Sequence, residues 1–336
     1  MPVNAEVYPA FYEMIQSTQW GNPMLPVDYD ERLWGDVIII DNQLVAGGWV
    51  GTIRGDIPLM RRIAKAVYFD SYPIFINECI EIKYYSKLLG HIKQHAIRDN
   101  IVMLNLTHWV RKEGNMVDVT EKSASFVTEL NTTEELLWKR VESKQRNCIR
   151  KGEKSGVEFE VCKTQDSLKY LGDFQKLRML TQQHAIGKNQ HASMLLKSDN
   201  FFKKLLLLPT TTLFVGKIQD QIATVALMIQ SGQSAYYYSG GSNYELNRQY
   251  SCSSFVIWKA MCYYNNLGVR FFDMGGVPVN PNKEHPAFGV YAFKRSFGGE
   301  YMEFNGGYVI ISPWKYKLLK FILSQRKVLR FFSTKI

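Results

Sequence analysis

The sequence lacks a long apolar run, a leader segment and a paired-cysteine motif. No apolar run approaches the roughly 18–20 residues that a membrane-spanning helix needs. The opening residues, MPVNAEVYPAFY, show no basic segment followed by an apolar one, so we predict no secretory signal and expect a cytoplasmic location. The five cysteines are odd in number and widely spaced, which argues against a disulfide framework and a zinc cluster.

Several common catalytic motifs are also missing. There is no G-x-S-x-G elbow, no glycine-rich phosphate loop ending in Lys-Ser/Thr, and no dinucleotide-binding fingerprint. His91 and His95 are four residues apart, but HIKQH lacks the glutamate of a zinc protease, and we interpret the pair as part of an ordinary helix face. We therefore predict no metal and no cofactor, and nothing supports a hydrolase with a covalent nucleophile.

What the chain does have is an uneven positive charge. Its 336 residues are 46% hydrophobic and 21% charged, enough for about two globular domains, and the net charge is +10. After Glu303 there is no acidic residue, while seven lysines and arginines follow. A second basic cluster covers residues 139–154. Such patches indicate an anionic partner, which is RNA, a nucleotide, a pyrophosphate or an acidic membrane face.

The apolar pattern predicts a mixed α/β fold. β-branched residues on both sides of short turns predict strand hairpins at 37–53 and 213–239, and QLVA at 43–46 aligns with QIAT at 221–224. If this short match is a true repeat, one α/β unit occurs twice. Helices are predicted after a capping box at Thr132 and Glu135, at 166–185, 192–207 and 251–266, and after Ser312-Pro313. This order predicts a mixed sheet with helices on its faces.

Two segments carry residues suited to acyl transfer, a reaction that needs positioning and charge stabilisation more than a special nucleophile. The first is AFGVYAFKRSFGG at 287–299, which we interpret as a strand; there Lys294 is a cation for a phosphate, a carbonyl oxygen or a departing ribose oxygen, or simply an outward-facing lysine. The second is YYYSGGSN at 236–243, where a bulged strand before a glycine pair lets a ligand approach the backbone, or where glycines only turn the chain. The candidate substrate-binding residues here are Tyr238, Gly240 and Gly241.

The F-K-x-x-F-G-G segment, preceded by FFDMGG at 271–276, resembles the C-terminal core of the Fem-type aminoacyltransferases. These enzymes build peptide cross-bridges on bacterial cell-wall precursors and belong to the wider GNAT N-acyltransferase superfamily. The resemblance implies two tandem GNAT-like domains, 1–127 and 128–308, without a coiled-coil arm. It also implies that Phe293 and Lys294 lie at the peptide-forming centre. Asp273 matches the family's strand-end acid, which orients a base or stabilises the glycine turn.

Further binding residues follow from this resemblance. Tyr291 is expected on the same strand face as Phe293, where it lines the pocket, and Arg295 is a further candidate for binding substrate. The basic segment from Lys144 to Lys151 resembles the family's basic helix, so its cations are candidates for binding RNA or phosphate, with a solvated helix face as the alternative. These cations are Lys144, Arg146, Arg150 and Lys151.

The basic C-terminal helix, within 309–336, is expected to pack back on the first domain. Its apolar side carries Trp314, Leu318, Ile322 and Leu329. The alternative is peripheral contact of residues 314–332 with an anionic membrane at its inner face, near a lipid-linked substrate.

The preferred hypothesis is an N-acyltransferase that moves an aminoacyl group from aminoacyl-tRNA to an amine of a nucleotide- or lipid-linked cell-envelope precursor, either a peptidoglycan stem peptide or an amino sugar. The first alternative keeps the fold but uses an acyl-coenzyme A to acylate a surface-polysaccharide amino sugar. Residues 248–254 lack the glycines of a coenzyme A loop, which argues against it. The second alternative is a non-catalytic protein that binds RNA or a membrane.

Overall fold

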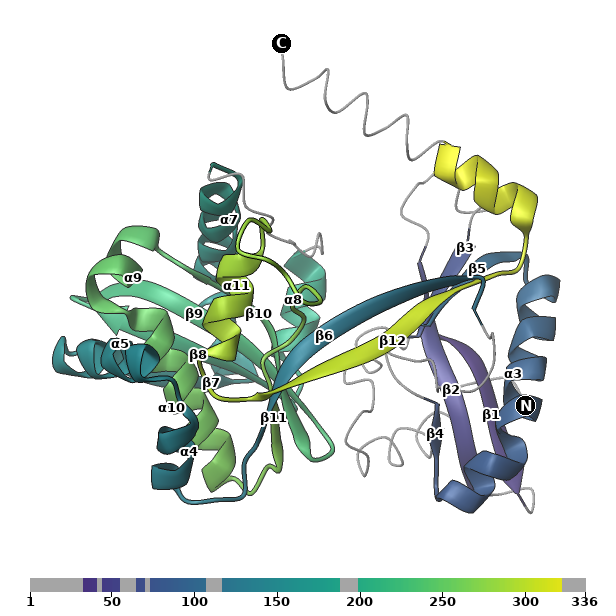
Figure 1. The fold of residues 1–336 in the computed structure, drawn as a ribbon, viewed down its shortest axis with the longest axis horizontal. Helices are drawn as coiled ribbons and strands as arrows, with labels where there is room; N and C mark the ends of the chain where they lie inside the picture. The colour runs from purple at the N-terminus through teal and green to yellow at the C-terminus, as the bar shows by residue number, and fades with distance from the viewer. Residues whose placement is uncertain are drawn as a thin grey trace, which may run out of the picture. The chain divides into compact units, whose positions relative to one another are not determined.

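The computed structural model describes residues 33–40, 44–54, 65–69, 73–106, 117–187 and 199–321. These residues form two compact units (Figure 1). The first contains the described residues up to 122 together with 304–321, and the second contains those from 123 to 303. The limits fall within two long strands, β6 (Val119–Glu129) and β12 (Glu300–Ile310). The predicted limits, 1–127 and 128–308, fall in the same two strands and stay a prediction.

The first unit is a sheet with one long helix against it. Its elements are β1 (Leu33–Ile40), β2 (Leu44–Arg54), β3 (Lys65–Phe69), β4 (Ile74–Phe75), α3 (Glu78–Arg98), β5 (Ile101–Leu106) and the end of β12. β3 and β5 are parallel, whereas β1–β2, β2–β3, β2–β4 and β5–β12 are antiparallel. The predicted hairpin at 37–53 is confirmed by the β1–β2 pairing.

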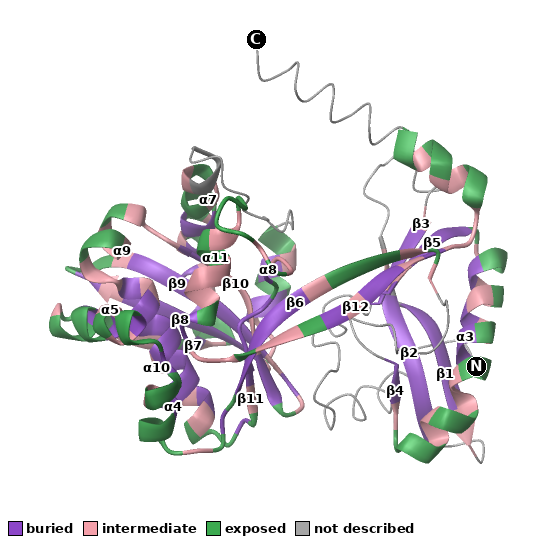
Figure 2. Ribbon diagram, viewed as in Figure 1, coloured by how far each residue is buried: buried purple, intermediate pink, exposed green. Residues whose placement is uncertain are grey.

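Helix α3 covers the core of this unit. Asn77 caps it by accepting a hydrogen bond from the Ile80 N–H, and acidic residues occupy its first turn. Its apolar face, which includes Leu88 and Ile92, is buried against strand residues such as Trp49. Figure 2 shows this arrangement, with buried residues along the strands and on one side of the helix.

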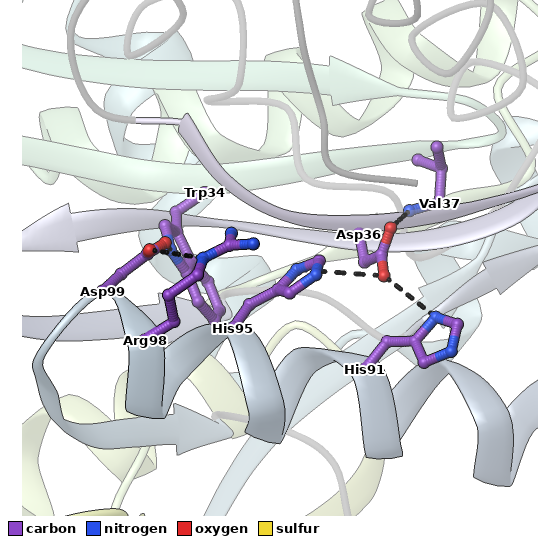
Figure 3. A network of polar contacts seen from close by, with 7 residues as sticks. All are labelled: Trp34, Asp36, Val37, His91, His95, Arg98 and Asp99. Carbon is purple, nitrogen blue, oxygen red and sulfur yellow. Dashed lines mark hydrogen bonds and ion pairs between the residues drawn. The ribbon is translucent and has the colours of Figure 1, made fainter.

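The histidine pair of HIKQH lies on α3 and faces β1 (Figure 3). The Nδ1 atoms of His91 and His95 lie 3.4 and 3.9 Å from Oδ2 of Asp36, which is fully buried. The other carboxylate oxygen accepts a hydrogen bond from the Val37 N–H. The pair is therefore part of the attachment between helix and sheet. Among the residues that the structure describes, no group of three or more potential ligands is arranged to hold a metal ion.

The second unit is larger and carries both motif segments. Its elements are β6, α4 (Glu134–Arg140), α5 (Ser143–Lys154), β7 (Glu158–Lys163), α6 (Gln165–Leu168), α7 (Leu171–Gly187), α8 (Asp199–Leu206), β8 (Thr211–Ile218), β9 (Gln221–Ser231), β10 (Ser234–Ser242), α9 (Tyr244–Tyr250), α10 (Cys252–Asn266), β11 (Phe271–Asp273), α11 (Phe288–Arg295) and the start of β12.

The sheet of this unit runs in the order β6-β11-β10-β9-β8-β7. The β10–β11 pair is parallel and the other pairs are antiparallel. One face packs on a core that includes Trp258 of α10 and Ile149 of α5, and the other on a core that includes Phe174 of α7 and Phe202 of α8. The predicted mixed sheet with helices on both faces is confirmed.

The predicted helix after residue 132 differs in two details. Thr133, not Thr132, is the N-cap, because its side chain accepts from the Leu136 N–H. The helix is also broken at Val141, whose extended backbone separates α4 from α5. Leu137 and Val141 are apolar residues four positions apart, the spacing that predicted one helix, and both are 1% exposed. The helix nevertheless ends at Val141, and α5 begins at Ser143.

Candidate functional site

Lys294 lies near the end of α11, and its ammonium points at the loop that follows β11. Nζ donates a hydrogen bond to the Gly276 carbonyl oxygen over 3.0 Å and lies 5.6 Å from the centre of the Tyr237 ring. Three separate segments therefore meet at this cation: α11, the glycine turn and β10. The ring face and the carbonyl oxygen both favour a positive charge.

The strand predicted for residues 287–299 is wrong. Residues 288–295 form a helix, and Phe297 follows it as a fully buried anchor. A short apolar run does not distinguish a strand from a helix by periodicity. Gly289 lies inside the helix, and Gly298 and Gly299 follow it. The role predicted for Lys294 did not depend on a strand. The prediction that Tyr291 and Phe293 share one face did depend on it.

Those directions change accordingly. Tyr291 and Phe293 are about 200° apart on a helix, so they do not share a face. Tyr291 packs against Phe126 at 5.1 Å between ring centres, whereas Phe293 packs against Phe297 at 5.2 Å. Both rings fix the position of α11 on the core of the unit, and Tyr291 lies one helical turn before Lys294.

Arg295 is directed elsewhere. Its Nε lies 3.0 Å from Oε1 of Glu142, the residue that precedes α5, and both side chains are largely exposed. The pair connects the end of α11 to the α4–α5 junction. Nothing in this geometry brings Arg295 to the ammonium of Lys294, so its predicted contact with substrate is unsupported by the arrangement.

Asp273 ends β11 and organises the glycine turn below Lys294. Its Oδ1 accepts a hydrogen bond from the Gly275 N–H over 2.7 Å and another from the Ser125 hydroxyl. Gly275 has a φ of 73°, a left-handed conformation that favours glycine. Of the two roles predicted for Asp273, the contacts support the stabilisation of the turn.

The turn also explains why two glycines stand there. A Cβ on Gly275 would come within 2.6 Å of the Tyr237 carbonyl oxygen, whereas one on Gly276 would meet nothing within 4 Å. The first glycine is therefore required for packing as well as for its φ. The second leaves the carbonyl that receives Lys294 accessible from one side.

Burial shifts the protonation of the two polar groups at this site. It lowers the pKa of Lys294 to about 8, while the negative charge of Asp273 acts in the opposite direction. Burial also raises the pKa of Tyr237 to about 12. With a lysine pKa of about 8 and a tyrosine pKa of about 12, the lysine is mostly protonated and the phenol is neutral at neutral pH. Lys294 can thus act as a cation or as a proton donor near physiological pH.

The strand β10 has the predicted bulge. Its pairing with β9 shifts register between Tyr237 and Ser239, so Tyr238 is the extra residue. Tyr237 packs on the core that also contacts α11, and Tyr238 packs on the opposite core, which contains α7. The aromatic residue beside Lys294 is therefore Tyr237, whereas Tyr238, the candidate for binding substrate, packs on the opposite core.

The glycine pair of β10 serves close packing. A Cβ on Gly241 would lie 2.4 Å from the Leu177 carbonyl carbon, and one on Gly240 would lie 2.2 Å from the Tyr237 hydroxyl oxygen. Gly241 lets the backbone of α7 approach the sheet, and Gly240 makes room for the Tyr237 side chain. Both belong to the surroundings of the site, and neither contacts Lys294 in the described geometry.

Tyr237 and Ser125 were not among the predicted residues. The sequence signal for Ser125 is a polar residue within SASFV, since an alternating strand seldom buries a hydroxyl without a bonding partner. For Tyr237 the signal was present but ambiguous, because three consecutive tyrosines precede the glycines and only the bulge decides which one faces α11.

The four predicted RNA-binding cations share α5 but differ in their contacts. Arg146 is occupied within the chain, since its Nη1 donates to the carbonyl oxygens of Val141, Lys139 and Trp138 at 2.5, 3.4 and 3.5 Å. It closes the α4–α5 break. The other three remain exposed: Lys144, Arg150, which lies 5.2 Å from the centre of the Trp138 ring, and Lys151, which lies near the Arg248 carbonyl oxygen.

The start of α10 is closed by the chain itself. Ser251, with a left-handed backbone, ends α9 and also precedes α10. The Ser253 N–H donates to the Asn247 side chain over 2.8 Å, and the Ser253 hydroxyl lies 3.0 Å from that of Thr224. One backbone donor that a pyrophosphate would use at this helix start, the Ser253 N–H, is thus already bonded within the chain.

Comparison with known proteins finds similarity in the segment that carries this geometry. Residues 211–324, which include β10, the glycine turn and α11, match the model of the FemAB family. This match covers about a third of the chain. Over 90 residues it is 30% identical to a Lipid II:glycine glycyltransferase of Staphylococcus haemolyticus (strain JCSC1435). That match covers 26% of the chain and about a fifth of the relative, 21%.

Solved structures show the same fold over nearly the whole chain. The structure of FemX superposes with a TM-score of 0.71 at 14% identity, covering 95% of this chain and 99% of that one. The structure of L-PGS from Bacillus licheniformis gives a TM-score of 0.57 at 12% identity, covering 97% of each chain. A C-terminal domain of a putative lysylphosphatidylglycerol synthetase from Agrobacterium fabrum gives 0.57 at 13% identity, covering 90% and 91%. At these identities the likeness establishes the fold, and the predicted mixed α/β fold is confirmed.

Proposed function

We propose that this Fem-type protein transfers an aminoacyl group from aminoacyl-tRNA to an amine of a cell-envelope precursor, either a peptidoglycan stem peptide or an amino sugar. The observation that carries the proposal is the ammonium of Lys294, which is held between the Gly276 carbonyl and the Tyr237 ring within the family-matched segment. A relative named for glycyl transfer to lipid II supports the choice of acceptor.

The proposed reaction is a single acyl transfer. The acceptor amine attacks the ester carbonyl of the aminoacyl-tRNA, an N–C bond forms, the C–O bond to the ribose breaks, and the proton lost by the amine ends on the ribose oxygen. Lys294 stabilises the negative charge that develops on the ester oxygens, and its lowered pKa lets it supply a proton to the leaving oxygen. The ester is already activated, so the proposal includes no cofactor.

Asp273 and Ser125 act in this scheme through the turn. They hold Gly275 and hence the Gly276 carbonyl, which orients the ammonium. Tyr237 presents its ring to the same ammonium and excludes water from one side. The three exposed cations on α5, Lys144, Arg150 and Lys151, are proposed to contact the tRNA backbone by charge.

Acyl-coenzyme A is the less favoured donor. A backbone cradle for its pyrophosphate would need free N–H groups at the start of α10, and the Ser253 N–H is already bonded to Asn247. The absence of glycine from residues 248–254 points the same way.

The test is transfer from a labelled donor. The purified protein is incubated with aminoacyl-tRNA or acyl-coenzyme A, each with a panel of muropeptide and amino-sugar acceptors. Transfer from the tRNA ester that falls at least a hundredfold in Lys294→Ala is the expected result. Transfer from the thioester alone would establish the coenzyme A reaction instead, and RNA binding without turnover under any condition would indicate a non-catalytic protein.

A further inference from the structure

The glycine turn after β11 contains a backbone donor that the fold does not use. The N–H groups of Met274, Gly275 and Val277 are bonded to acceptors in the same unit, at 2.9, 2.7 and 2.8 Å. The N–H of Gly276 has no hydrogen-bond partner among the residues that the structure describes. Gly276 is exposed, and a Cβ there would meet no atom within 4 Å, so a ligand can approach its backbone.

The direction of this N–H is fixed by the peptide to which it belongs. The carbonyl oxygen of the same peptide, that of Gly275, lies 3.1 Å from the hydroxyl oxygen of Ser125, which is buried. In a planar trans peptide the C=O and the N–H point in opposite directions. The Gly276 N–H therefore points away from Ser125 and is held in that direction before any substrate arrives. A donor that is oriented in advance needs no reorganisation during the reaction.

The Lys294 ammonium is a second donor beside the first. Its Nζ lies 3.0 Å from the Gly276 carbonyl oxygen and 3.5 Å from the point where a Cβ of Gly275 would stand. The amide nitrogen and the carbonyl oxygen of one residue are within about 4 Å of each other, so the two donors lie within about 7 Å. An ammonium has three N–H groups, and the bond to Gly276 uses one. Because the lysine stem is flexible, one oxygen between the two donors can accept from both.

The charge at this turn suits an oxygen that becomes negative only during a reaction. Lys294 brings one positive charge, and the carboxylate of Asp273 on the same turn partly offsets it. Arg295, the next cation on α11, is paired with Glu142 instead. A phosphate with a permanent charge would therefore meet little net positive charge here. The oxyanion of an acyl transfer instead needs a few donors at fixed positions.

We propose that the Gly276 N–H and the Lys294 ammonium together form the oxyanion hole of the acyl transfer. When the acceptor amine attacks, the N–C bond forms and the π electron pair of the ester C=O moves to the carbonyl oxygen, which both donors then bind. The pair returns as the C–O bond to the ribose breaks, and the ribose oxygen takes the proton lost by the amine. The inference rests on the proposed function and adds to it a catalytic group that is part of the backbone.

The experiment removes this N–H alone. Glycolic acid in place of Gly276, introduced by nonsense suppression, replaces the N–H with an ester oxygen and keeps the Gly276 carbonyl that receives Lys294. We expect kcat for transfer from aminoacyl-tRNA to fall about a hundredfold, with KM changed less than about threefold, because the donor acts in the transition state. A phosphonate analogue of the tetrahedral intermediate should bind this variant more weakly by a similar factor, whereas the affinity for tRNA should stay the same.

Two controls accompany this variant. Glycolic acid in place of Gly172, an exposed glycine on α7 where a Cβ would also meet nothing, should leave kcat unchanged. Thermal unfolding should give the Gly276 ester variant the melting temperature of the unaltered protein, because the lost N–H makes no bond within the described residues.

The inference is overturned if the Gly276 ester variant transfers at the rate of the unaltered protein while Lys294→Ala does not. The proposed function then stands, with the ammonium as the donor. A loss confined to KM also overturns it, because the N–H would then bind substrate and transition state equally. A thioester donor allows the same comparison, since its carbonyl oxygen becomes negative in the same way. If the unaltered protein transfers from neither donor, the proposed function is wrong and the inference is wrong with it.

Discussion

The Asp273 carboxylate and the Lys294 ammonium act on each other across the glycine turn of β11. The carboxylate fixes the Gly275 N–H, the next residue offers its carbonyl to the ammonium, and the negative charge opposes the fall in the lysine pKa that burial causes. Removing the negative charge of Asp273 should therefore change the pKa of Lys294 although the lysine itself is unaltered.

The first prediction concerns pH. Lys294 is proposed to act as a cation, so the transfer rate should fall as the pH rises through about 8, the lowered pKa of the lysine. In Asp273→Asn the cation loses a favourable charge, so its pKa falls further and this limb of the profile should move to lower pH. The measurement is the pH dependence of kcat/KM for both proteins, with Lys204→Met, an exposed lysine on α8, as the control. A limb that rises through pH 8 would mean that the neutral amine acts as a base instead.

The second prediction is that Lys294→Met stabilises the fold while removing activity. A lysine whose pKa is lowered by burial costs folding free energy at neutral pH, because the unfolded chain binds the proton more tightly. We expect a gain of about 1 kcal/mol at pH 7, reduced by the residual solvent contact and by the lost bond to Gly276. The advantage should shrink as the pH rises from about 8 toward the ordinary lysine value. The measurement is urea unfolding of the variant and the unaltered protein at pH 7 and near the ordinary lysine pKa. An equal difference in unfolding free energy at both pH values would contradict the explanation.

The third prediction uses the two adjacent glycines as a matched pair. Gly275→Ala should destabilise the protein by about 2 kcal/mol or more, because its φ is positive and a Cβ would meet the Tyr237 carbonyl oxygen. Gly276→Ala, one residue on, should change stability by less than about 0.5 kcal/mol, since a Cβ there meets nothing. Thermal unfolding of the two variants decides the point, and similar losses in both would show that the turn is not formed as described.

The fourth prediction separates two arginines on α5. Arg146→Ala should lower stability, because three carbonyl oxygens at the α4–α5 junction lose their donor. Arg150→Ala should instead leave stability nearly unchanged and reduce tRNA affinity, with the slope of log K against log salt smaller by about one. Urea unfolding and filter binding at several salt concentrations provide the two readouts. If both variants lose the same RNA affinity and neither loses stability, Arg146 binds RNA like Arg150 and does not stabilise the α4–α5 junction.

The fifth prediction concerns the carboxylate of Glu160 on β7. Its hydrogen bonds with Lys169, Lys217 and Tyr170 hold its pKa well below the usual range. The resulting stability is present above the ordinary glutamate value and is lost as the pH falls through the lowered pKa. Glu160→Gln should therefore cost about 1 kcal/mol at pH 7 and progressively less in strong acid. Unfolding curves from pH 7 to pH 2 test this, and a cost that does not change with pH would exclude the charge as its cause.

The sequence allowed the fold to be predicted well where patterns are long. The β1–β2 hairpin and α10 were recognisable because β-branched alternation and helical periodicity each extend over many residues. The short helix α11 was misread, because eight apolar-rich residues, Gly289 among them, fit either period. The α4–α5 break was missed for a different reason: it depends on Arg146, whose role as a donor to carbonyls is invisible until the chain is folded.

In the candidate site, too, some residues could be identified from the sequence and others only from the folded chain. Lys294 and Asp273 were identified by their motifs, and the structure brings both to one turn. Arg295 was a substrate-binding candidate from the same segment, but on the helix its side chain is paired with Glu142. Tyr237 could not be separated from Tyr238 by residue type, since one inserted residue in β10 decides which ring lies over the ammonium.

That inserted residue shapes β10 without setting its register. Deleting Tyr238 would leave Tyr237 opposite Met228 and Gly241 opposite Val225, because Tyr238 is the extra residue in this pairing. The deletion would instead remove a ring that packs on the core beside α7, together with the local bend and twist that a bulge gives its strand. Position 238 therefore lets one strand serve the Lys294 side with one tyrosine and the α7 side with the next.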